Sequence, residues 1–472
     1  MQKKITVAWL LIIAFFTWVV LANLMQDGMF IDGVLYSSVA RNFSLGMGSF
    51  WNMHFSKTVF NNFHEQPPLF FLLQSVFFKI IGDNIYPERV YCLVMSMLTA
   101  FVIIKFWKEI ASSSIGFSWL PVLLWISIPV VSWGLINNVI ENTLLLFDLL
   151  AVYFLFRIFK GKSVSWNLFF SFLFLFAASL SKGIQGLFPL AVPVIYFVST
   201  RKISFLKSFV LTALLVSGLA ITYALLLMSD AVFESYKLYF ASRFPGFPHT
   251  PNQNTEYRIY MFFTLLSELI VPGALAFIAW LIYKKQKIKS SIGLSQKQLA
   301  LFFVIVGLSA SLPLMFSFEQ RRFYLITSLP YFVFGLSIIS EKWFSEIILP
   351  FTFHEKIKKP LKLFLMAAIF SGLGYTYLQA GNIKRDKELL HDVYFLKDII
   401  GANKIVSTTP SGWGNWAIQN YFQRYDNISL SVTVDSCTYH LQPVTEGAWN
   451  NNSFKKINLE TKYFDVYERI KK

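Results

Sequence analysis

The chain has 472 residues, of which 55% are apolar and only 14% are charged, and its mean hydropathy is +0.52. Soluble domains carry roughly 25% charged residues, so this composition excludes a single soluble core and indicates a lipid solvent. The net charge of +16 does not predict a nucleic-acid partner, because the basic residues are placed as in a membrane topology, and the two cysteines, Cys92 and Cys437, show no metal-ligand spacing.

Apolar runs of about 20 residues, the length that crosses a roughly 30 Å hydrocarbon core, recur along the chain. The first follows Lys3 and Lys4 and has no small-x-small cleavage site, so we interpret it as a retained span. We predict an all-α polytopic membrane domain over residues 1–380, with about eleven transmembrane helices. In chain order the predicted spans are residues 5–24, 89–107, 118–134, 139–157, 165–180, 184–199, 208–228, 259–283, 298–316, 323–340 and 361–379.

Basic residues gather in alternate loops, for example over residues 284–289 and 356–362. The positive-inside rule places these loops and the N-terminus in the cytoplasm. The long connections, residues 25–88, 229–258 and everything from 381 onward, are then expected on the opposite face. We therefore look for function on the extracytoplasmic side.

The long connections have predicted structure of their own. Within residues 25–88, Gly33–Leu45 and Leu69–Ile81 are amphipathic or too short to cross the bilayer, so we expect helices that lie along the membrane surface. The polar tail, residues 381–472, is predicted to be a small extracytoplasmic α/β domain. Its helix-like segments are Lys387–Ile400 and Trp416–Tyr425, and its strand-like segments are Lys404–Thr409 and Ile428–Val434.

Charged residues near a lipid boundary are expensive to hold, so those on the outer face are functional candidates. They occur in recognisable surroundings, namely Asp32 after the first span, Glu65 in His64-Glu65-Gln66-Pro67-Pro68, Arg89, Glu141, Lys182 in Ser181-Lys182-Gly183, Arg243, His249, and Arg321-Arg322-Phe323-Tyr324.

This order of motifs resembles the family of polyprenyl-phosphate-sugar-dependent glycosyltransferases of the GT-C fold, which includes protein O-mannosyltransferases and bacterial aminoarabinose transferases that act on lipid A. The resemblance covers most of the membrane part. It implies an inverting glycosyltransferase of the bacterial inner membrane. Its partners would be a polyprenyl-phosphate-linked sugar donor, membrane lipid and an extracytoplasmic acceptor such as lipid A, protein or cell-envelope glycan, with no nucleotide cofactor.

The resemblance also implies roles for the candidate residues. Asp32 matches the family's acidic position after span one and would be the general base that takes the acceptor's proton. The leaving phosphate needs positive charge, which Arg321, Arg322, Lys182 and Arg243 would supply. The supporting residues are Glu141, Arg89 and Tyr324. Glu65 and His249 match positions that in some members lie near a divalent metal ion.

The chain departs from the family at two positions and leaves structural alternatives open. Many relatives have a second acid where this chain has Gly33, and a lysine where it has Gln66. Several of the candidate residues also fit a purely structural role. Asp32 could cap a helix, Lys182 could extend its ammonium group to the membrane surface, and Arg321-Arg322 could anchor a helix at the interface. Glu65 and His249 also fit ordinary loop positions.

Two other membrane functions compete with this interpretation. A polysaccharide polymerase or ligase also uses lipid-linked sugars, but the His-Glu-x-Pro-Pro element argues against it. A transporter or lipid flippase should carry ionisable residues at mid-membrane in several helices, whereas only Asp148 and Glu268 lie near the middle of a predicted span.

Overall fold

The computed structural model describes residues 6–111, 117–241, 258–285, 292–317, 319–353 and 355–470. The chain divides into two compact units, each formed by two separate stretches of sequence. The first, here called the helical unit, comprises Met1–Leu24 and Cys92–Leu378. The second, here called the mixed unit, comprises Met25–Tyr91 and Gln379–Lys472. The predicted boundary between the membrane domain and the tail, at residues 380 and 381, lies close to the observed boundary between Leu378 and Gln379. The first long loop, however, belongs to the same unit as the tail.

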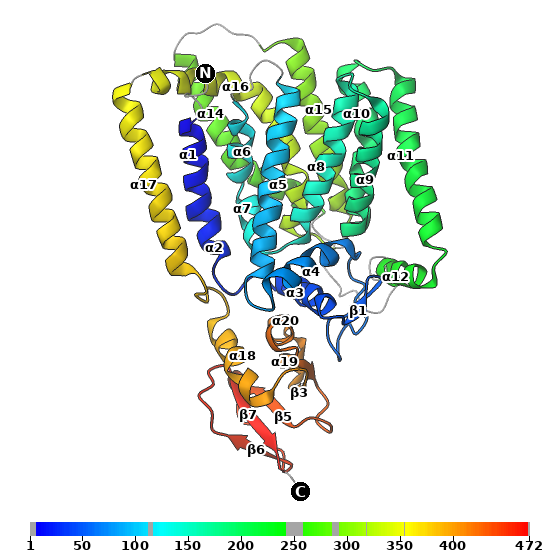
Figure 1. Ribbon diagram of the computed structural model, residues 1–472, viewed down its shortest axis with the longest axis vertical. Coiled ribbons are helices and arrows are strands. Elements are labelled where there is room, and N and C mark those ends of the chain that lie inside the picture. The colour runs from blue at the N-terminus through cyan, green and yellow to red at the C-terminus, as the bar shows by residue number, and fades with distance from the viewer. Residues whose placement is uncertain are drawn as a thin grey trace. The chain divides into compact units, whose positions relative to one another are not determined.

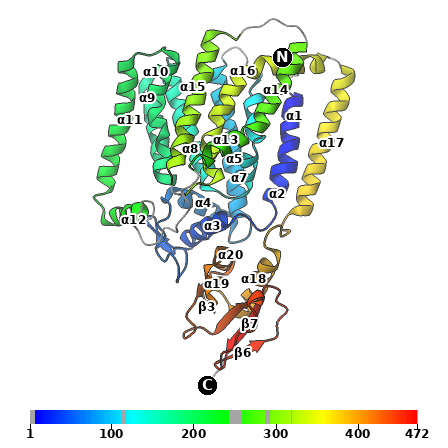
Figure 2. The same cartoon turned by 180° about the vertical axis from the view of Figure 1, so that it is seen from behind.

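The helical unit is a bundle of apolar helices that run roughly side by side (Figures 1 and 2). Among the described residues, seven helices are long and apolar enough to cross a membrane, or nine if each bent helix pair counts as one span. This establishes a multi-pass membrane protein. The count treats Val164–Thr200 as one apolar stretch, although that stretch holds two of the eleven predicted spans, and it omits α16 (Leu329–Phe353), which turns polar at Glu341 and Lys342.

The stretch Val164–Thr200 reverses direction at Gly183. Helix α9 (Val164–Lys182) ends there, and the 3₁₀ helix η4 (Gly183–Ala191) packs back against it before α10 (Val192–Thr200) begins. A Cβ atom added at Gly186 would lie only 2.7 Å from the carbonyl carbon of Ala178, which shows how closely the two arms approach. The predicted spans 165–180 and 184–199 are therefore the arms of one hairpin.

Two predicted spans are sharply bent. Helices α6 (Trp119–Ile126) and α7 (Pro129–Ile136) meet at 80°, and α13 (Tyr260–Glu268) and α14 (Ile270–Lys285) meet at 44°. Pro129 opens α7, and Ile128 before it is extended, as expected for a residue that precedes proline. The spans predicted at 118–134 and 259–283 are thus broken.

The other elements of the helical unit follow the predicted spans, except for α12, which lies across the end of α11 (Figure 2). These elements are α1 (Thr6–Phe15), the π-helix η2 (Phe16–Leu21), α2 (Ala22–Leu24), α5 (Pro87–Ile110, which begins in the mixed unit), α8 (Ile140–Phe159), α11 (Phe205–Leu226), α12 (Asp230–Ala241), α15 (Leu294–Ser311), η6 (Leu312–Phe316), η7 (Arg322–Thr327) and α17 (Glu355–Gln379).

The mixed unit joins two surface helices to a small sheet. Its first stretch holds α3 (Ile31–Ser44) and α4 (Leu69–Ile81), close to the predicted segments, with the short strands β1 (Gly48–Ser49) and β2 (Asn52–Met53) between them. The tail forms a five-stranded mixed sheet in the order β4-β3-β5-β7-β6. Its elements are α18 (Lys387–Ile400), β3 (Ile405–Thr408), α19 (Pro410–Gly414), α20 (Trp416–Asp426), β4 (Ser429–Ser431), β5 (Tyr439–Pro443), η8 (Val444–Glu446), β6 (Phe454–Ile457) and β7 (Phe464–Arg469).

One hydrophobic core explains why these two stretches form a single unit. Met29 and Val34, from the first long loop, are buried in the same cluster as Leu390 of α18 and Phe422 of α20. The start of α3 is therefore packed against the tail.

Within the sheet of the tail, strand β3 pairs in parallel with β4 and β5, whereas β7 pairs antiparallel with β5 and β6.

Candidate active site

The Lys182 turn of the helical unit is the first part of the candidate site. Lys182 is buried at the end of α9, and its ammonium group forms an ion pair with Glu141 in the first turn of α8. The backbone can reverse here because Gly183 has a φ of +65°, a conformation that glycine adopts without steric cost. The hydroxyl group of Tyr239, in α12, donates a 3.5 Å hydrogen bond to the Lys182 carbonyl.

The segment η7 lies against this turn. The Lys182 Nζ atom is 4.0 Å from the centroid of the Tyr324 ring, a cation–π distance. The Gln185 side chain donates a 3.0 Å hydrogen bond to the Tyr324 carbonyl. The structure thus brings together three residues that the sequence selected: Glu141, Lys182 and Tyr324.

Arg322 occupies the first position of η7 and is bound to an acid that we had not assigned to the site. Its guanidinium pairs with Glu268, a buried carboxylate at the end of α13. The other Glu268 oxygen accepts a 2.9 Å hydrogen bond from the backbone N–H of Val130. About half of the Arg322 side chain is exposed, and Arg321 beside it is exposed, so both retain accessible positive charge.

Asp32 lies in the first turn of α3 in the mixed unit and is half-buried. The helix begins at Ile31, with Phe30 as its N-cap and no side-chain cap hydrogen bond, so Asp32 is not the N-cap residue. The tail fixes the backbone before it. Asn420 Nδ2 donates a 2.9 Å hydrogen bond to the Ile31 carbonyl, and the Tyr421 hydroxyl donates a 3.3 Å one to that of Met29.

Arg89 lies in a buried network of the mixed unit. Its guanidinium is 3.0 Å from Asp27 and donates a 2.8 Å hydrogen bond to the Gln26 carbonyl. The hydroxyl groups of Tyr425, at 2.9 Å, and of Tyr394 also donate to the Asp27 carboxylate. Arg89 therefore supports the segment that leads into α3 by holding Asp27.

A second buried arginine, Arg424 of α20, extends this network. It lies 2.9 Å from Asp83 and 3.0 Å from Glu88. Nearby ionised carboxylates raise the pKa of Arg424 despite its burial. The arginine consequently stays charged and ties α20 to the loop after α4.

The residues assigned to a metal lie partly outside the described chain. Glu65 is half-buried ahead of Pro68, which is the N-cap residue of α4, and burial lowers the pKa of neighbouring His64. Arg243 and His249 lie outside the described residues. Within the described ranges, no three His, Cys, Asp or Glu side chains are placed to hold a metal ion together. The described donors alone therefore do not form a metal site.

Four residues that contact the candidate site residues or their neighbours in the chain have no recognisable motif in the sequence. These are Gln185, Tyr239, Asn420 and Glu268, of which only Glu268 stands out in the sequence, as a charge within a predicted span. One signal was available: Val232, Tyr236 and Tyr239 recur at helical spacing and are the buried face of α12. The contacts of Gln185 and Asn420 join distant parts of the sequence, and no local pattern indicates them.

Comparison with solved structures identifies the fold. ArnT from Cupriavidus metallidurans, in its apo state and bound to undecaprenyl phosphate, matches with a TM-score of 0.61 in each case and 12% identity. The match covers 98% of this chain, and 96% and 97% of the two ArnT chains. The Archaeoglobus fulgidus oligosaccharyltransferase, in complex with Zn and sulfate, is more distant: 11% identity and a TM-score of 0.48, over 94% of this chain and 68% of that one.

A family model provides a separate comparison. Residues 65–227 match the family described as dolichyl-phosphate-mannose-protein mannosyltransferase. No curated protein sequence matches the chain. The ArnT-like fold and the family match together indicate the class of protein, a membrane glycosyltransferase of the GT-C fold. The predicted fold class and enzyme class are confirmed.

Proposed function

We propose that this protein transfers a sugar from a polyprenyl-phosphate donor to an acceptor on the extracytoplasmic side of a bacterial inner membrane. The family description names a dolichyl-phosphate sugar, and one matching ArnT structure holds undecaprenyl phosphate, which supports this donor class. The observation that carries the proposal is the cationic cluster of the helical unit. Buried Lys182 contacts η7, and the same segment presents Arg321 and Arg322.

These cations suit a leaving phosphate. When the glycosidic bond breaks, negative charge grows on the phosphate oxygen, and fixed positive groups stabilise it without having to reorganise. The ion pair with Glu141 and the contact with the Tyr324 ring hold the Lys182 ammonium in place. Arginine can bind two phosphate oxygens at once, which favours Arg321 and Arg322 as the direct phosphate ligands.

Asp32 is the proposed general base. The acceptor hydroxyl attacks the anomeric carbon from the side opposite the phosphate, its proton passes to the Asp32 carboxylate, and the phosphate leaves with the bonding electrons, so the configuration inverts. The Asp27–Arg89 pair and the hydrogen bond from Asn420 to Ile31 fix the segment that carries the base. Fixed geometry of this kind is what general-base catalysis requires.

Arg243, Glu65 and His249 complete the proposal. Arg243 would add positive charge near the phosphate, and Glu65 and His249 would hold a divalent ion together with phosphate oxygens. Such an ion, when bound, would neutralise part of the phosphate charge. Loss of turnover on chelation, with recovery on adding back Mg²⁺ or Mn²⁺, would support this part of the proposal.

The decisive experiment supplies the purified protein with synthetic polyprenyl-phosphate monosaccharides and an envelope extract. We expect release of polyprenyl phosphate together with a glycosylated product, and accumulation of the donor in cells that lack the protein. Consumption of lipid-linked oligosaccharides alone would favour a polymerase or ligase. If the protein consumed no lipid-linked sugar, the proposal would be wrong.

A further inference from the structure

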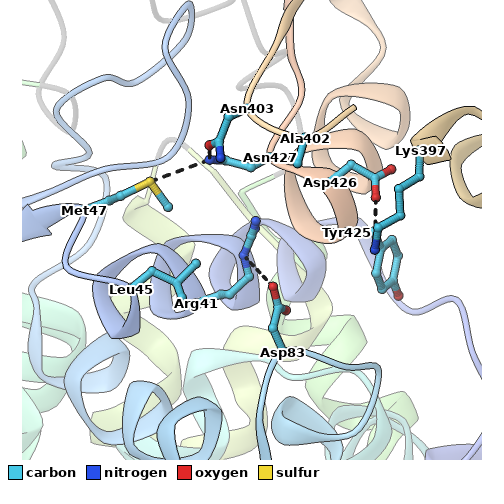
Figure 3. Close-up of a pocket in the computed structure, with 10 residues that line it drawn as sticks. All are labelled: Arg41, Leu45, Met47, Asp83, Lys397, Ala402, Asn403, Tyr425, Asp426 and Asn427. Atoms are coloured by element: carbon cyan, nitrogen blue, oxygen red, sulfur yellow. Dashed lines mark hydrogen bonds and ion pairs between the residues drawn. The ribbon is translucent and has the colours of Figure 1, made fainter. Parts of the chain in front are cut away.

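The mixed unit contains a polar pocket that shares only Asp83 and Tyr425 with the buried network described above (Figure 3). Its volume is about 370 Å³, within the range of small-molecule sites. The pocket lies where the end of α20 and the segment after α18 meet the surface of α3. Its lining residues are Arg41, Leu45, Met47, Asp83, Lys397, Ala402, Asn403, Tyr425, Asp426 and Asn427.

Asp426 is the most unusual residue of this pocket. The residue is 2% exposed, and neither carboxylate oxygen accepts a hydrogen bond from the described residues. Asp426 forms an ion pair with Lys397, but the Lys397 Nζ atom is 3.7 Å away, longer than an ordinary hydrogen bond (Figure 3). Asp426 also ends α20, where the helix dipole disfavours negative charge. Buried polar groups are normally hydrogen-bonded, so this carboxylate has fewer donors within the described chain than a buried acid usually has.

Arg41 lies on the opposite side of the pocket, and one of its N–H groups lacks an acceptor within the described chain. It is 3% exposed, and its Nε–H group donates no hydrogen bond within the described chain. Its nearest acid, Asp83, lies 3.6 Å away. The side-chain amide of Asn427 donates a hydrogen bond to that of Asn403, and both residues line the pocket. The pocket thus combines a buried carboxylate whose described partner is the Lys397 ion pair and a buried Nε–H group that donates no hydrogen bond within the described chain.

This mixture of charges limits the class of ligand that the pocket can bind. A lone anion would be repelled by Asp83 and Asp426, and a metal cation would be repelled by Arg41 and Lys397. A neutral compound rich in hydroxyl groups satisfies both kinds of group, because each hydroxyl donates one hydrogen bond and accepts others. Carboxylate, guanidinium and amide side chains are all suited to hydroxyl recognition.

We propose that this pocket binds one sugar residue, through hydroxyl groups that donate to Asp426 and accept from Arg41. Assigning that sugar to the glycan part of the acceptor rests on the proposed function, whereas sugar binding by the pocket does not. The pocket would then hold the acceptor by a part of it that does not react, and so contribute to acceptor specificity.

The titration of Asp426 provides a second measurement. Burial raises the pKa of this carboxyl from 3.8 to about 7, while Lys397 and Arg41 act in the opposite direction and Asp398 in the same direction. Asp83, the other acid of the lining, also faces the pocket. Sugar hydroxyl groups donate to the ionised carboxylate, so binding should strengthen as the pH rises from 6 to 8.

The test uses full-length protein in lipid nanodiscs, which avoids sugar-headed detergents. Saturation-transfer NMR with methyl glycosides of neutral hexoses and N-acetylhexosamines should show binding to the wild type. Asp426→Asn should weaken that binding at least tenfold, whereas Glu388→Gln, which removes an exposed acid of α18 outside the pocket, should not change it. Donor consumption is measured separately, so failure of sugar binding and failure of the proposed function are distinguishable.

Thermal stability separates a binding role from a structural one. A carboxylate that served the fold would lose stability on substitution. We expect Asp426→Asn to raise the Tm, with a larger gain at pH 8 than at pH 5, because the cost of ionising the buried group develops between pH 4 and 7. The proposal is overturned if no glycoside binds, if phosphate or Ca²⁺ binds in preference, or if Asp426→Asn destabilises the protein without changing sugar binding.

Discussion

At the scale of single residues, Asp32 is the most direct test of the mechanism. We expect Asp32→Asn to lower turnover by about 10² to 10⁴, since an amide cannot accept the acceptor's proton. The fold should tolerate the change, because Phe30 and not Asp32 occupies the N-cap position of α3. Loss of a first-turn charge costs only about 0.3–1 kcal/mol.

Purified protein with measured Tm and donor binding is needed for that comparison. Glu388→Gln, which removes an exposed first-turn acid from α18 in the same unit, is the matched control and should retain full turnover. Turnover of Asp32→Asn within about threefold of the wild type would reject Asp32 as the base. Glu65 and Glu141 would then be the next carboxylates to examine.

The adjacent arginines should behave differently from each other. Arg322→Ala leaves buried Glu268 without its cation, so we expect a loss of stability on the order of 1–2 kcal/mol in addition to weaker donor use. Arg321→Ala removes an exposed side chain and should raise the donor KM with little change in Tm. Donor titration combined with thermal unfolding measures both. Unchanged donor kinetics in both variants would support the membrane-anchor role.

At the scale of elements, the hairpin between α9 and η4 positions Lys182. Gly183→Ala forces a Cβ atom onto a backbone with a φ of +65° and a ψ of −131°, and against the Tyr239 hydroxyl. The conformation alone costs roughly 1–3 kcal/mol, and displacement of the turn should also raise the donor KM. Gly161→Ala is the matched control, because Gly161 has a φ of +77° but nothing within 4 Å of the added Cβ. Equal donor kinetics in both variants would show that the turn does not position the site.

Elements were predictable where a local pattern is strong. Lys387–Ile400 and Leu69–Ile81 were predicted with the observed boundaries, because each has apolar residues on one helix face and a glycine immediately after its end. Strands β5, β6 and β7 were not predicted. Tyr439–Pro443 contains histidine, glutamine and proline, Phe454–Ile457 has two lysines at its centre, and Phe464–Arg469 carries three charged residues. The sheet, and not their own sequence, determines that they are strands.

At the scale of the whole molecule, the grouping of the first long loop with the tail was not predictable. Hydropathy identifies both as polar connections, but nothing local indicates that Met29 and Val34 enter the tail's core, or that Arg424 binds Asp83 and Glu88. The candidate site is a parallel case. The order of the motifs predicted Glu141, Lys182 and Tyr324 as site residues. The ion pair between Glu268 and Arg322 joins residues far apart in the sequence, so only the structure shows it.

Membrane orientation is the prediction on which the whole functional proposal depends. Asn52 and Asn452 are exposed and belong to the mixed unit, so both should lie outside the cytoplasm. Lys162 is exposed in the loop between α8 and α9, which the positive-inside rule assigns to the cytoplasm. The natural cysteines, Cys92 and Cys437, are buried and should add little background.

In intact spheroplasts, a membrane-impermeant maleimide should therefore label Asn52→Cys and Asn452→Cys, and should label Lys162→Cys only after permeabilisation. The reverse pattern would place Asp32 in the cytoplasm and overturn both the orientation and the proposed extracytoplasmic transfer. Labelling of only one of the two mixed-unit sites would instead contradict the single compact unit that contains them.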